Sequence, residues 1–166
     1  MKALPWILVL TASAVLAGTP RQHVVDCIPL PQCGDPSTFG DTFAWQQLGP
    51  VDFLQLLERI MKSGNSTNRS WWYTVDGTHR GWIQASDIPA LLKLLDSTAP
   101  CAAVVSSTSS VLPSEASTIG HEAMFLIEGY RHGSYPPALI SSQCNCDPAE
   151  IRLWWEGRRH DERSGT

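Results

Sequence analysis

The sequence predicts a small, mainly α-helical single domain of about four helices with one β-hairpin, held together by disulfides. Three observations predict this fold. Residues 114–133 carry apolar side chains at helical spacing over the longest periodic stretch of the chain. An aromatic and β-branched run is followed by Asp76-Gly77, a dipeptide typical of tight hairpin turns. Five cysteines follow an export-type N-terminus, which favours disulfide formation.

The first residues have the pattern of a signal peptide. Lys2 precedes the apolar run Leu4 to Gly18, and Val15 and Ala17 occupy the −3 and −1 positions of a cleavage site. The run is shorter than the ~20 apolar residues that a membrane span needs. We therefore expect residues 1–17 to be removed. The mature chain is then exported, either periplasmic or secreted, with no integral membrane segment.

The mature chain is expected to contain three parts. Residues 18–49 are rich in proline and glycine, which interrupt helices, so they are expected to wrap around the domain without regular structure. Residues 50–157 form the helical domain, and residues 158–166 a polar tail. In the first helix, Pro50 suits the first turn and Gly64 ends the apolar stripe.

The predicted hairpin spans residues 71–84. Its arms are Trp71 to Val75 and Arg80 to Gln84, joined through Asp76-Gly77. Since two strands alone are marginal in water, one face is expected to pack on the helices. The later run Cys101 to Val105 is predicted to be buried, as either a short strand or a helix, because its periodicity does not distinguish the two.

Three further helices follow the hairpin. One starts at Ser86 or Asp87, with Pro89 in its first turn. The second spans residues 114–133, with Ser117 or Thr118 as cap and Gly133 as the terminating residue. The last begins at Asp147-Pro148, which combines a cap residue with proline at the first helical position.

The cysteines predict two disulfides and one free thiol. The candidates are Cys27, Cys33, Cys101, Cys144 and Cys146. A bridge between Cys144 and Cys146 closes a very tight ring, so we expect these two to pair elsewhere. Cys27 and Cys33 pair either with each other or with the Cys144–Cys146 segment.

Charge excludes some partners. The chain has a formal net charge of −4, and loss of Lys2 with the signal peptide makes it more negative. This argues against binding to nucleic acid or to anionic membrane surfaces.

The sequence indicates no catalytic residue, metal site or cofactor. His121-Glu122 lacks the second histidine of a zinc-protease motif, because position 125 is Phe125, so we interpret both as surface residues. Cys144-Asn145-Cys146 as a metal-binding pair and Cys101 as a nucleophile are weaker interpretations, since the compartment favours disulfides. Enzymatic activity stays uncertain, with a binding role favoured.

Aromatic residues carry the functional hypothesis, because exposed tryptophans are favoured in interfaces and as stacking platforms. We expect an exported protein that binds a protein partner, in an inhibitor or immunity-type role. A cell-wall or glycan-binding protein that uses the tryptophan pairs is the alternative, and a small extracytoplasmic hydrolase is the third. The candidate binding residues are Trp71, Trp72, Tyr73, His79, Trp82, Trp154 and Trp155.

Overall fold

The computed structural model describes residues 45–63 and 71–164. The predicted signal peptide (residues 1–17), most of the proline-rich segment, and the cysteines Cys27 and Cys33 lie outside the described residues.

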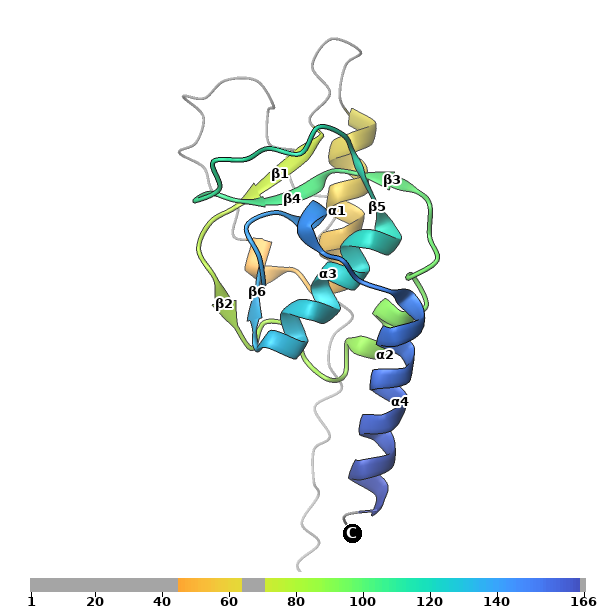
Figure 1. The fold of residues 1–166 in the computed structure, drawn as a ribbon. Helices are drawn as coiled ribbons and strands as arrows, with labels where there is room; N and C mark the ends of the chain where they lie inside the picture. The colour runs from red at the N-terminus through yellow and green to blue at the C-terminus, as the bar shows by residue number, and fades with distance from the viewer. Residues whose placement is uncertain (1–44, 64–70, 165–166) are drawn as a thin grey trace, which may run out of the picture.

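Helix α3 (Ile119–His132) is the centre of the fold (Figure 1). It contacts the helices α1 (Pro50–Ser63), α2 (Ile88–Leu92) and α4 (Pro148–Ser164). It also contacts the strands β5 (Ser117–Thr118) and β6 (Ser134–Tyr135) and the short 3₁₀ helix η5 (Ser141–Gln143). The predicted apolar stripe is buried, with Ala123, Leu126 and Ile127 fully inaccessible to solvent. Neighbouring residues on other faces are buried too, because elements pack on α3 from several sides.

The predicted cap residues of α3, Thr118 and Gly133, are confirmed by their geometry. The Thr118 hydroxyl accepts a hydrogen bond from the His121 N–H (3.2 Å), and Gly133 is left-handed with φ of 73°. The helix nevertheless starts later than residue 114. Strand β5 (Ser117–Thr118) pairs antiparallel with β3 (Pro100–Cys101), which holds the preceding residues in an extended conformation.

The expectation of a mainly helical fold with one hairpin is wrong. In the described residues, short strands form three separate two-stranded sheets. Strand β1 (Trp72–Val75) pairs in parallel with β4 (Ala103–Ser106), in the register Trp72 to Ala103. Strand β2 (His79–Arg80) pairs antiparallel with β6 (Ser134–Tyr135) instead of with β1.

The physical reason for this pairing lies in β4. All four of its residues are buried, as is usual for a parallel strand covered on both faces. The chain bends at Gly77, which has φ of 66°, but it then leaves β1 and does not close a hairpin. The segment that contains α2 supplies the long connection that a parallel pair requires.

The remaining helices agree with their predicted starts. Helix α1 (Pro50–Ser63) begins at the predicted proline. Helix α2 (Ile88–Leu92) is short; Asp87 precedes it, but its carboxylate accepts from the Gln84 N–H (2.8 Å) and makes no cap bond. Helix α4 (Pro148–Ser164) extends away from the body of the molecule and continues through most of the predicted polar tail (Figure 1).

Aromatic rings fill one end of the core. Trp45, from the 3₁₀ helix η4 (Trp45–Gln47), packs edge-on against Trp82 with ring centroids 4.6 Å apart. Phe53 of α1 and Tyr135 of β6 complete the cluster, with their centroids 6.1 Å apart. None of the helices in the described part of the chain is both long and apolar enough to span a bilayer.

Candidate functional site

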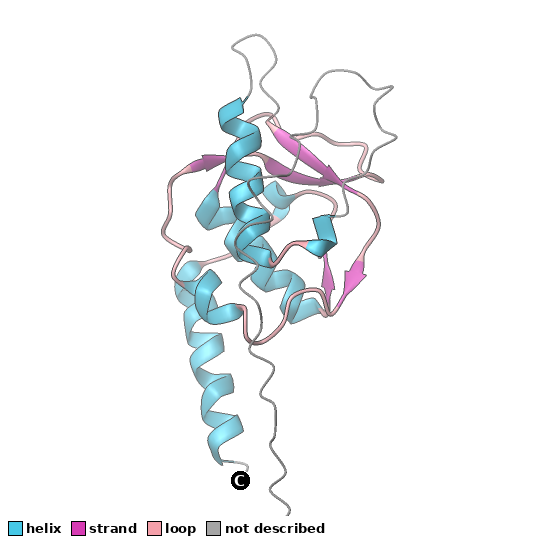
Figure 2. Cartoon of the chain, turned by 180° about the vertical axis from the view of Figure 1, so that it is seen from behind, coloured by secondary structure: helices cyan, strands magenta, loops and turns pink. Residues whose placement is uncertain are grey.

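The two predicted tryptophan pairs do not share a surface. Trp71 and Trp72 lie at the start of β1, whereas Trp154 and Trp155 belong to α4. Strand β1 and helix α4 lie at opposite ends of the molecule in both ribbon views (Figure 2). Trp71 is 37% exposed, while Trp155 is only 8% exposed and belongs to the core.

Two other predicted binding residues, Tyr73 and Trp82, pack against the core. The Tyr73 ring packs against Phe53 at 5.9 Å, and burial raises the pKa of its phenol to about 12. The Trp82 indole N–H donates to the Leu48 carbonyl (3.0 Å), which satisfies its polar atom inside the protein.

His79 and Trp82 do meet at a small cavity of about 190 Å³ beside β2 and the end of α3. Tyr130, Ser134 and Tyr135 also line this cavity. The His79 Nε2 atom accepts from the Gln46 side-chain amide (2.7 Å). Three aromatic rings therefore line this cavity, and its histidine already has a hydrogen-bond partner.

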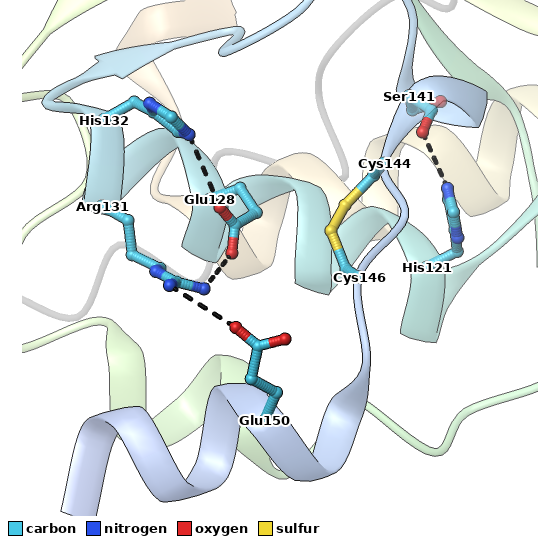
Figure 3. The surroundings of a disulfide bond; sticks show 8 residues. All are labelled: His121, Glu128, Arg131, His132, Ser141, Cys144, Cys146 and Glu150. Carbon is cyan, nitrogen blue, oxygen red and sulfur yellow. Dashed lines mark hydrogen bonds and ion pairs between the residues drawn. A yellow bond between two sulfur atoms is a disulfide. The ribbon is translucent and has the colours of Figure 1, made fainter. Parts of the chain in front are cut away.

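The larger cavity, of about 310 Å³, lies between α3, the segment 137–147 and the start of α4. We call it the groove. Helix α3 supplies Glu128, Arg131 and His132 (Figure 3). The other residues that line it are Phe125, Pro137, Ala138, Gln143, Cys144, Asn145, Cys146, Asp147, Glu150 and Ile151.

Charged side chains in the groove form a small network (Figure 3). Arg131 lies 2.6 Å from a Glu128 oxygen and 3.8 Å from a Glu150 oxygen. The guanidinium of Arg131 also lies over the ring of Trp154, a predicted binding residue, at 5.1 Å from the ring centroid. Glu150 is 68% exposed and remains available to a ligand.

A disulfide between Cys144 and Cys146 forms part of the groove wall. The expectation that these two cysteines pair elsewhere is contradicted by this bridge. The segment around Asn145 is neither helix nor strand, and it brings the two Cα atoms to 5.2 Å, within the usual range for disulfides. Cys101 is a buried free cysteine.

A second polar centre is buried under α3, where Glu122 was predicted to lie on the surface. That prediction is wrong: the Glu122 side chain is completely buried. Burial raises the pKa of its carboxyl to about 7, although the hydroxyls of Ser117 and Ser141 and the charge of His121 act in the opposite direction. His121 Nε2 donates to the Ser141 carbonyl (2.7 Å) at the edge of this centre.

The buried centre around Glu122 is separate from the two cavities described above. Neither of the two cavities is lined by Glu122 or Cys101. Burial, together with the nearby Glu122 and Glu58, raises the pKa of the Cys101 thiol, so it stays protonated at neutral pH. Among the described residues, no three His, Cys, Asp or Glu side chains lie together in a way that could hold a metal ion.

Sequence reasoning missed most of the groove. Glu128, Arg131 and His132 lie on the polar face of a predicted helix, and Glu150 in the acidic first turn of another. The only local sequence feature that indicates a site here is the cluster of Cys144, Cys146 and Asp147. Nothing in the sequence indicates that the segment after Pro137 returns across α3, which is what creates the groove.

No protein-family model matches the chain, and no curated protein or solved structure is significantly similar to it.

Proposed function

We propose that this chain is an exported binding protein whose groove takes a basic segment of a protein partner. The observation that carries the proposal is the charge of the groove. Three carboxylates, those of Glu128, Asp147 and Glu150, line it against one permanently charged cation, Arg131. The C-terminal end of α3 adds partial negative charge to the groove and the N-terminal end of α4 adds partial positive charge, so the acidic character comes from the three carboxylates.

The geometry supports a side chain with a cationic end group. Glu128 is only 18% exposed and already pairs with Arg131, so it holds the network in place. Glu150 lies 3.8 Å from Arg131, which is a loose contact that an incoming ammonium or guanidinium group can replace. The overall acidity of the chain also favours encounter with a basic partner.

The test uses lysine-rich, serine-rich and glutamate-rich peptides of equal length, titrated into the mature chain by calorimetry at low salt. We expect the lysine-rich peptide to bind most tightly and its affinity to fall as salt screens the charges. Glu150→Lys is expected to weaken this binding about tenfold, since it replaces attraction by repulsion at the mouth of the groove.

Glu156→Lys is the matched control, because it makes the same change at an exposed position further along α4, outside the groove. It should leave the affinity within about a factor of two. Equal binding of all three peptides, or an equal loss in both variants, would contradict the proposal.

A further inference from the structure

The Cys144–Cys146 disulfide occupies an unusual position for a structural bridge. The two cysteines are separated only by Asn145, and both side chains are half-buried. They face the groove opposite Glu128, Arg131 and His132 (Figure 3). A molecule bound in the groove therefore lies against these two residues.

This bridge contributes little to folding by restricting the unfolded chain. Stabilisation of that kind grows with the length of the closed loop. A sequence separation of two residues gives the smallest loop that the chain can offer. Because stabilisation of the fold does not explain this disulfide, we consider a chemical role for it in the groove wall.

The surroundings distinguish the two sulfur atoms. Cys146 lies two residues before Pro148, the first residue of α4. A thiolate close to the N-terminus of a helix is stabilised by the positive end of the helix dipole. The cationic Arg131 lines the same groove and acts in the same direction, while the cap residue Asp147 opposes it. Cys144 follows η5 and has no helix start beside it. Cys146 is therefore the better leaving group, and Cys144 is the sulfur to be attacked.

We propose that this disulfide oxidises a pair of thiols in a peptide bound in the groove. A substrate thiolate attacks Cys144 Sγ, the Cys144–Cys146 bond breaks, and its electron pair leaves on Cys146 as a thiolate. The second substrate thiolate then attacks the substrate sulfur of the mixed disulfide and releases Cys144. The substrate dithiol loses two electrons and becomes a disulfide, the protein disulfide gains them, and the two substrate protons pass to Cys144 and Cys146.

The preference for a basic substrate rests on the proposed function, whereas the exchange step does not. The probes are therefore two synthetic peptides with the same pair of cysteines, one flanked by lysines and the other by glutamates. Each is mixed with the oxidised mature chain. The reaction is stopped with acid, free thiols are alkylated, and the modified cysteines are located by mass spectrometry.

We expect one peptide disulfide to form per chain, with alkylation at Cys144 and Cys146. Groove binding should make the lysine-flanked peptide react about tenfold faster with the protein than with free glutathione disulfide at equal concentration. Cysteamine, a cationic monothiol, should form its mixed disulfide on Cys144 and not on Cys146. The double variant Cys144→Ser/Cys146→Ser should lose the reaction while its melting temperature stays within a few degrees of the parent.

Three results would overturn the exchange proposal: alkylation of Cys144 and Cys146 only after unfolding, a rate no higher than that of glutathione disulfide, or mapping that finds either cysteine bridged to Cys27 or Cys33. Equal rates for the two peptides, each above the glutathione reference, would retain the exchange and contradict the basic partner. Tight binding of the lysine-flanked peptide without its oxidation would retain the basic partner and contradict the exchange.

Discussion

Raising the pH from 4 to 8 is expected to destabilise this protein by about 3 kcal/mol through Glu122 alone. The pKa of its carboxyl rises from 4.5 to about 7 on folding, chiefly because the side chain is buried. Between these two values the folded state binds a proton that the unfolded state has lost, so the free energy of unfolding falls as pH rises. The contribution is fully present below about pH 4.5 and is lost as pH rises through about 7.

The groups around Glu122 belong to several elements. Cys101 of β3 and Tyr135 of β6 have their own pKa values raised, mainly by burial and further by the Glu122 charge. Ser117 and Ser141 supply hydroxyls, and His121 lies next to Glu122 in α3. No described residue gives either Glu122 oxygen a hydrogen bond of normal geometry, so ionisation leaves a buried charge without adequate compensation.

The measurement is urea unfolding at a series of pH values for the parent and for Glu122→Gln. The amide has nearly the same shape and does not ionise, so the variant should lose the pH dependence that comes from this site. The stability difference between variant and parent should therefore grow in favour of the variant by about 3 kcal/mol from pH 4 to pH 8. Glu115→Gln, at an exposed position, is the control and should leave the slope of the parent unchanged. Identical slopes in the parent and Glu122→Gln would contradict the assignment.

Replacing Gly120 with alanine is expected to destabilise the fold by about 3 kcal/mol. A Cβ atom at this position would lie 2.4 Å from the Leu95 carbonyl oxygen and 2.7 Å from that of Ser97. Both are backbone atoms, and the Gly120 N–H donates to the same Ser97 oxygen (2.9 Å). The clash therefore cannot be relieved by rotating a side chain. To make room for the Cβ atom, α3 has to move away from the turn after α2.

Gly157→Ala in α4 is the matched control, since nothing lies within 4 Å of a Cβ atom there. Alanine is the better helix former, so this variant should be more stable than the parent by about 0.5–1 kcal/mol. Thermal unfolding of both variants checks the prediction. A Gly120→Ala protein that melts with the parent would show that α3 does not approach this turn so closely.

The sequence alone determined the features that depend on neighbouring residues. Pro50 marks the start of α1, Thr118 and Gly133 bound α3, and Asp147-Pro148 opens α4. Caps and apolar periodicity act over one or two helical turns, so these signals are complete within a short stretch of chain.

Only the tertiary structure decided which strands pair and where the groove lies. A strand such as Trp72–Val75 has the same local preference for a hairpin partner as for a distant one, and the buried run Ala103–Ser106 provides the more extensive packing. The burial of Glu122 also results from long-range packing. The elements β3, β6 and η5 cover the side of α3 that carries Glu122, which the sequence predicts to be a polar surface. Contacts between residues far apart in the chain set these features, and local sequence carries no record of them.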